Sequence, residues 1–310
     1  MKTLRIVFMG TPDFAVPCLQ ALVDSPHTVV GVFTQPDKPQ GRKMLLTPPP
    51  VKVLAVENNI PVYQPEKMKD SSTFEQLQAL APDLIVVVAY GKILPQAVLD
   101  LPQYGCINVH ASLLPKYRGA APIQWAVLDG ETETGVTVMQ MDAGVDTGDM
   151  LLVKKTPIDP EETAEALFDR LAVLGGQALA EILPQLDDLH PVPQPKGAFG
   201  YAKMISKSMS PIDWSCSAAQ VHNQVRGLYS WPCATTTIAG KTVKVLSCRI
   251  SHQKGTIPGA VVESKNHLVI ACGDGDCVEL LVVQPQGKKA MDAKAFLAGH
   301  PLSVGTVLGA

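Results

Sequence analysis

The first half of the chain alternates between short apolar runs and helix-length segments. The first run, residues 4–10, ends at Gly10 and is followed by Pro12, which is suited to opening a helix. Further runs of the same buried-strand type lie at 28–34, 83–91, 105–110, 135–142 and 150–155. Strand and helix signals that alternate in this way predict an α/β fold with a Rossmann-like, doubly wound and mostly parallel sheet. A helical pattern over 162–186 closes this domain.

The pattern then changes. A proline-rich stretch, PVPQP at 191–195, predicts a linker over 189–206. Beyond it, short β-rich runs are separated by Gly-containing turns, at 242–250, 259–264, 267–272 and 277–285. Such spacing predicts a small, mostly antiparallel β-barrel, such as the five-stranded oligonucleotide-binding (OB) type. We therefore expect a first domain at 1–188 and an OB-like domain at 207–310.

The charge is distributed unevenly along the chain. The formal net charge is −3, yet residues 1–202 contain 15 Lys and Arg against 23 Asp and Glu, whereas residues 203–310 contain 11 against 6. A basic C-terminal domain on an acidic body favours a polyanionic partner. The bias is modest, and a chance distribution of charges is the alternative.

Cysteine usage and hydropathy narrow the class of protein further. The seven cysteines are scattered and form neither a CxxC motif nor a Cys/His cluster with zinc spacing, so we expect reduced thiols in a cytoplasmic protein and no metal. The apolar run at the N-terminus is too short for a signal peptide. No run approaches the ~20 apolar residues of a membrane span, and we expect no membrane segment.

The sequence GTPD at 10–13 stands where a dinucleotide-binding fold would carry GxGxxG. It lacks the second and third glycines, which let the backbone approach a pyrophosphate. An NAD-type cofactor is therefore disfavoured, and a plain strand-to-helix turn is the simpler interpretation.

Polar side chains interrupt the apolar strand at 105–110. Asn108 and His110 are two residues apart, so on a strand they share a face, near the carboxyl end where open α/β sheets bind ligands. The loop DAGVDTGD at 142–149 follows the next strand and holds three carboxylates. Each feature alone has an ordinary explanation, a satisfied polar pair or a turn. Together they are typical of a site that stabilises an oxyanion while the substrate supplies the nucleophile, as in acyl transfer to an amine.

Several longer stretches resemble one enzyme family. INVHASLLPKYRGAAPIQ (107–124) and GVTVMQMDAGVDTGD (135–149) are similar to the formyltransferases that use 10-formyltetrahydrofolate. The members that formylate methionyl-tRNA are matched more specifically by GTPDFAVPCLQAL (10–22), VVGVFTQPDKPQGRK (29–43), PPPVK (48–52) and IDW (212–214). The similarity extends from residue 4 to about 290. Departures occur at Ala111, in the loop after Arg42 and at KSMSP (207–211).

The resemblance implies a reaction and the residues that carry it. A formyl group would pass from 10-formyltetrahydrofolate to the α-amino group of methionine on initiator tRNA, in a catalytic domain at 1–188. Asn108 and His110 would bind the oxyanion, and Asp146 would orient and charge the imidazole. No metal or NAD would take part, and a cytoplasmic monomer is expected.

The resemblance also implies two binding regions. The folate pocket would be lined by Ser112, Leu113, Leu114 and Pro115. Contacts to tRNA would come from the loop at 34–50 and from the basic C-terminal domain, with the candidates Arg42, Lys43, Lys203, Lys207 and Arg226.

Two alternatives stay open. An enzyme with the same catalytic half could formylate a nucleotide sugar or release formate from the folate, but a small acceptor needs neither the basic C-terminal domain nor the loop around Arg42. A catalytically idle module that binds single-stranded RNA is the other alternative. The complete set of Asn108, His110 and Asp146, and an aromatic content of only 5%, argue against it.

Overall fold

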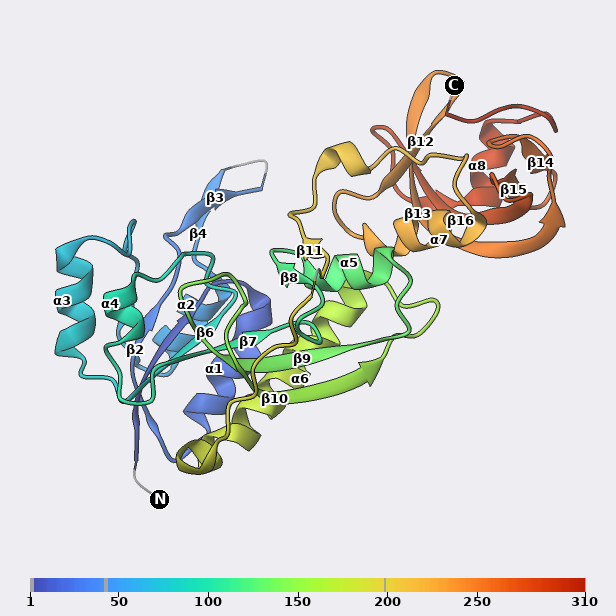
Figure 1. Ribbon diagram of the computed structural model, residues 1–310. Helices are drawn as coiled ribbons and strands as arrows, with labels where there is room; N and C mark the ends of the chain where they lie inside the picture. Colours follow the sequence, from blue (N-terminus) through green and yellow to red (C-terminus); the bar gives the residue numbers. More distant parts are fainter. Residues whose placement is uncertain (1–2, 42–43, 198, 310) are drawn as a thin grey trace. The chain divides into compact units, whose positions relative to one another are not determined.

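The computed structural model describes residues 3–41, 44–197 and 199–309 (Figure 1). The chain forms two compact units. The first comprises Met1–Gly119, Thr134–Thr156 and Phe168–Tyr201, and the second comprises Ala120–Glu133, Pro157–Leu167 and Ala202–Ala310. The contiguous domains at 1–188 and 207–310, with a linker at 189–206, stay a prediction, which limited proteolysis would check.

A seven-stranded sheet forms the centre of the first unit, in the order β10-β9-β7-β6-β1-β2-β5. The bounds are β1 (Arg5–Gly10), β2 (Thr28–Phe33), β5 (Val62–Tyr63), β6 (Leu84–Val88), β7 (Cys106–His110), β9 (Glu133–Gln140) and β10 (Met150–Pro157). The neighbouring strands from β5 to β7 are parallel, whereas β9 pairs antiparallel with β7. The predicted mostly parallel α/β sheet is therefore confirmed, and β9 is an antiparallel neighbour of β7, the strand that carries Asn108 and His110.

Helices cover both faces of this sheet. Alternate residues of a strand point to opposite sides, and the strands are apolar at successive positions, so both faces need to be covered. On one face, Cys106 belongs to an apolar cluster with side chains of α3 (Ser71–Ala79) and α4 (Gln96–Leu99). On the other face lie α1 (Val16–Val23) and α6 (Ala164–Ile182). A Cβ added to Gly175 of α6 would lie 3.1 Å from Val109 and 3.4 Å from the Cys18 sulfur. Asn108 and His110, which alternate with Val109, therefore project from the face opposite α6.

The other elements of the first unit are short. They are the helix α2 (Pro50–Glu57), the 3₁₀ turns η1 (Asp13–Ala15) and η2 (Leu183–Asp188), and the strands β3 (Lys38–Gln40), β4 (Leu45–Thr47) and β8 (Arg118–Gly119). Residues 10–13 lead from β1 through η1 into α1, as the predicted strand-to-helix turn. The segment 34–50 contains an antiparallel hairpin of β3 and β4. The sequence did not indicate this hairpin, because strands of three residues are too short to show alternation.

The second unit contains a curled antiparallel sheet in the order β12-β13-β16-β15-β14, with β17 beside β16. The bounds are β12 (Ala234–Ile238), β13 (Lys241–Lys254), β14 (Val261–Glu263), β15 (Leu268–Ala271), β16 (Asp276–Pro285) and β17 (Met291–Asp292). The pairing of β13 with β16 changes register between Val245 and Cys248, and such bulges bend a strand. The predicted β-rich, barrel-like C-terminal domain is confirmed.

Helices accompany this sheet. They are α5 (Pro122–Leu128), α7 (Ala218–Gly227), α8 (Ala293–Gly299) and the turn η3 (Lys207–Met209), and the two-residue strand β11 (Tyr201–Ala202) leads into the unit. On the sheet, Glu279 accepts hydrogen bonds from His267 at 2.6 Å and Arg249 at 2.7 Å. Burial alone would raise the pKa of Glu279, but these bonds lower it overall. Within the described ranges, none of the helices is both long and apolar enough to cross a bilayer.

Candidate active site

Strand β7 presents Asn108 and His110 on one face of the sheet, at its carboxyl end. The Asn108 side chain is half-buried. Its side-chain amide makes no hydrogen bond to the described residues. An amide whose N–H groups are uncommitted, next to a histidine on the same strand face, is available to an oxygen of a substrate.

The loop that carries Asp146 is held in a compact shape by its own residues. The Asp142 carboxylate accepts hydrogen bonds from the Gly144 amide at 3.0 Å and the Thr147 hydroxyl at 2.7 Å. Gly148 lies so close to β9 that a Cβ there would be 1.7 Å from the Gln140 carbonyl oxygen. The glycines and Asp142 of the DAGVDTGD motif thus shape the loop, and Asp146 is left to face the strand.

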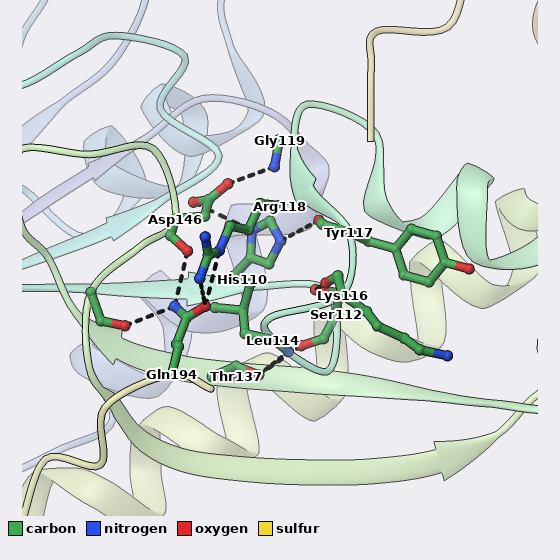
Figure 2. Close-up of polar contacts among 11 residues, drawn as sticks. His110, Ser112, Leu114, Lys116, Tyr117, Arg118, Gly119, Thr137, Asp146 and Gln194 are labelled. Atoms are coloured by element: carbon green, nitrogen blue, oxygen red, sulfur yellow. Dashed lines mark hydrogen bonds and ion pairs between the residues drawn. The ribbon is translucent and has the colours of Figure 1, made fainter. Parts of the chain in front are cut away.

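His110 lies between two oxygen acceptors (Figure 2). Its Nε2 is 2.9 Å from the Tyr117 carbonyl oxygen, and its Nδ1 is 3.6 Å from Oδ1 of Asp146. The side chains of His110 and Asp146 are only 7% and 13% exposed. A neutral imidazole can donate its one N–H to the Tyr117 carbonyl, whereas an imidazolium can also form an ion pair with Asp146. The arrangement therefore suits a ring that receives and passes on a proton.

The other carboxylate oxygen of Asp146 is fixed from the opposite side. Its Oδ2 accepts a hydrogen bond of 2.8 Å from the backbone amide of Gly119. The backbone of Asp146 is left-handed, with φ of +54°. The structure therefore places Asn108, His110 and Asp146 at the carboxyl end of β7, where Asn108 and His110 come from the strand and Asp146 from the loop at 142–149.

Comparison with known proteins identifies the family. The family described as "Formyl transferase" matches residues 4–183, and "Formyl transferase, C-terminal domain" matches residues 204–301. Proteins named methionyl-tRNA formyltransferase from Trichlorobacter lovleyi and Pelobacter propionicus are 51% and 50% identical. These matches cover 99% and 100% of this chain, and 98% and 97% of the relatives. The chain belongs to the formyl transferase family.

Two solved structures have the same fold at lower sequence identity. The N-formyltransferase from Helicobacter canadensis, in complex with folinic acid and dTDP-3-aminofucose, has a TM-score of 0.70 at 18% identity. That match covers 91% of this chain and 100% of the other. HypX from Aquifex aeolicus, in complex with tetrahydrofolic acid, has a TM-score of 0.60 at 17% identity, over 98% of this chain and 48% of the other. At these identities the likeness concerns the fold.

The SLLP segment of this formyl transferase forms a buried turn after β7. The Ser112 hydroxyl donates to the Lys116 carbonyl at 2.7 Å, and the Ser112 carbonyl accepts from the Thr137 hydroxyl at 2.7 Å. Thr137 also accepts from the Leu114 amide at 3.2 Å. Leu114 and Pro115 are buried, and Leu113 is partly exposed. The polar groups of Ser112 therefore serve the turn, which leaves Leu113 as the side chain of this segment that a ligand can reach.

The predicted tRNA contacts fall into three groups. Arg42 and Lys43 lie outside the described residues. Lys203 and Lys207 are exposed. Arg226, in contrast, is 7% exposed, and burial lowers the pKa of its guanidinium despite acidic neighbours that raise it.

The guanidinium of Arg226 is committed to the protein. It donates to Asn223 Oδ1 at 2.8 and 3.0 Å, to the Glu162 carbonyl at 3.2 Å and to the Val127 carbonyl at 3.4 Å. A phosphate contact would require these bonds to be given up, so the geometry favours a structural role for this residue. Charge alone did not distinguish it from the exposed lysines.

Sequence reasoning missed two residues beside the site, Arg118 and Gln194. The Gln194 side chain contacts both Arg118 and the backbone of the Asp146 loop. The signal that could have drawn attention to Gln194 is a single amide between Pro193 and Pro195 in an otherwise featureless linker.

Proposed function

We propose that this formyl transferase moves the formyl group of 10-formyltetrahydrofolate to the α-amino group of methionine on initiator tRNA. The observation that carries the proposal is the match of about 50% identity over the whole chain to proteins named methionyl-tRNA formyltransferase, including the region after residue 204. A nucleotide-sugar acceptor has weaker support, because the Helicobacter canadensis N-formyltransferase, in complex with dTDP-3-aminofucose, is only 18% identical to this chain.

In the proposed reaction the substrate amine is the nucleophile. Its nitrogen bonds to the formyl carbon, the carbonyl oxygen becomes an oxyanion, and the bond from that carbon to N10 then breaks. The proton lost by the amine goes to N10, and tetrahydrofolate leaves. The formyl carbon keeps its oxidation state throughout, so this chemistry needs no NAD, and the nucleophile is the amine itself and not a metal-activated water.

The proposed roles follow the geometry of the site. The uncommitted N–H groups of Asn108 donate to the oxyanion, where one such donor contributes about 10²- to 10³-fold in rate. His110 donates there as well, by sharing or exchanging its bond to the Tyr117 carbonyl. Asp146, 3.6 Å from the ring, stabilises the imidazolium that forms when the ring takes up a proton.

The proposed substrate contacts are assigned by region. Folate binds against the SLLP turn (Ser112, Leu113, Leu114 and Pro115), with Leu113 offering apolar surface. The curled sheet of the second unit is proposed to be an OB-type barrel, and Lys203 and Lys207 to contact tRNA phosphates. Arg42 and Lys43 are proposed to grip the acceptor stem, so Arg42→Ala lowers kcat/KM for tRNA and Arg42→Lys restores only part of it.

A direct assay tests the function. Purified protein is incubated with 10-formyltetrahydrofolate carrying a labelled formyl group and with methionine-charged initiator tRNA. Uncharged initiator tRNA, methionine-charged elongator tRNA and a dTDP-amino sugar serve as controls. Label should appear on the charged initiator tRNA alone, and faster transfer to the sugar would refute the proposal. Light scattering checks the predicted monomer against the chain mass of 33.1 kDa.

A further inference from the structure

The side-chain amide of Gln194 uses all of its hydrogen-bonding capacity at the catalytic loop (Figure 2). Its Nε2 donates to the carbonyl oxygens of Asp146 at 2.9 Å and Gly148 at 2.8 Å. Its Oε1 accepts from Nε and a terminal nitrogen of Arg118, at 3.0 and 2.6 Å. A primary amide offers two donors and an acceptor with two lone pairs, and here every one has a partner.

Gln194 differs in burial from the rest of its segment. Among the described residues from 190 to 200, Gln194 is the only one that is not exposed. Two residues earlier, Val192 exchanges both backbone hydrogen bonds with Met150, each of 2.8 Å. Residues 192–194 are therefore hydrogen-bonded to the loop that carries Asp146 and to Met150, which follows it. The proline-rich composition of this segment predicts a linker.

Two adjacent residues, Arg118 and Gly119, fix both the backbone and the side chain of Asp146. Gly119 donates its backbone N–H to the carboxylate, and Arg118, through Gln194, anchors the backbone carbonyl. These contacts matter because Asp146 has φ of +54°, a left-handed conformation that Asp adopts less readily than glycine and less often than the right-handed regions. An alternative backbone conformation at this position would turn the carboxylate away from His110.

We propose that Gln194, oriented by Arg118, is a positioning residue for catalysis. It holds the backbone at Asp146 so that Oδ1 of the carboxylate faces Nδ1 of His110. This inference rests on the proposed roles of His110 and Asp146 in formyl transfer. It also gives the segment after residue 188 a part in the chemistry, in addition to its connection to the second unit.

The test uses the full-length protein and four variants. Gln194→Met keeps the length of the side chain and removes its hydrogen bonds. Gln194→Glu can still pair with Arg118 but places an oxygen against two carbonyl oxygens. Arg118→Lys keeps the charge and loses the two-nitrogen fork. Gln185→Ala is the matched control, because the Gln185 amide also donates to a backbone carbonyl, that of Glu181 at 2.9 Å, away from the site.

We expect Gln194→Met and Gln194→Glu to lower kcat by about 10- to 100-fold, with KM for both substrates within about threefold, because catalysis is sensitive to small displacements. Arg118→Lys should have a smaller effect in the same direction, and Gln185→Ala none. A merely structural residue would lower the melting temperature without this selective loss of kcat. If Gln194→Met does not fold, Gln194→Glu and Arg118→Lys decide the question by the same readout.

A second arm asks whether Gln194 acts through Asp146. In the Asp146→Asn background, Gln194→Met should change kcat by less than about twofold, since residues that act as a unit are non-additive. Additive losses, or a Gln194→Met enzyme with wild-type kcat, would overturn the inference. An inactive wild-type enzyme would instead refute the proposed function, and an Asp146→Asn variant with full activity would refute the proposed role of Asp146, on which this inference rests.

Discussion

Replacing Asp146 by Asn removes the negative charge of this side chain and keeps its hydrogen bond to the backbone amide of Gly119. The Asn oxygen can still accept the 2.8 Å bond from the Gly119 amide. Its NH₂ group then faces Nδ1 of His110, while Nε2–H remains on the Tyr117 carbonyl. The variant therefore suits a neutral ring and opposes the imidazolium, which the wild-type carboxylate stabilises.

The size of the effect follows from the distance between the two groups. An imidazolium and a carboxylate 3.6 Å apart attract each other by about 5 kcal/mol at an effective dielectric constant of about 20. Because about 1.4 kcal/mol corresponds to a factor of ten, we expect kcat to fall by about 10³- to 10⁴-fold. KM for both substrates should stay within about threefold, since the substrates are bound by other groups.

The assay is steady-state formylation of methionine-charged initiator tRNA at saturating formyl donor, with circular dichroism to verify the fold. His110→Asn and the double variant with Asp146→Asn complete a cycle. The double variant should be about as slow as the slower single variant, because the two residues act as one unit. The reasoning is refuted if Asp146→Asn reduces kcat less than about tenfold, or if the losses in the cycle add.

Further perturbations test the oxyanion donor, the tRNA contacts and the environment of two buried groups. Asn108→Ala should lower kcat by about 10²- to 10³-fold with little change in KM, and a loss confined to KM for folate would remove the oxyanion assignment. Lys203→Ala with Lys207→Ala should reduce the salt dependence of tRNA binding without changing folate affinity, and an unchanged salt slope would exclude these contacts. Glu279→Gln should destabilise the protein by about 1 to 3 kcal/mol at neutral pH. The folded-state pKa of Glu279 is depressed from 4.5, so the deficit in the free energy of unfolding should shrink as pH falls below that value, and a deficit independent of pH would contradict the ion pairing. Burial raises the pKa of the Cys106 thiol to about 12, so iodoacetamide at pH 8 should label it only in denaturant, and rapid labelling of the native protein would show that this core opens.

The sequence by itself determined the strands of the sheet and the placement of Asn108 and His110 on the same face of one strand. Continuous apolar runs such as residues 84–88 mark strands buried on both faces, and their alternation with helices implies parallel neighbours. The two-residue period of a strand placed Asn108 and His110 together without knowledge of the fold. The direction of β9 was not readable, because a buried strand has the same apolar pattern whether it runs parallel or antiparallel to its neighbour.

The tertiary structure decided which partners meet these side chains. Asp146 reaches His110 because its loop is left-handed at one residue and packed against β9, a geometry that depends on Gly148 and on contacts from Gly119. Gln194 joins the site from 48 residues further along the chain, through bonds to backbone carbonyls that leave no sequence pattern. Arg226 is buried because three oxygen acceptors from different segments surround it. Period and composition describe neighbours along the chain, whereas these contacts join residues far apart in sequence, and only the folded chain brings those residues within hydrogen-bond distance.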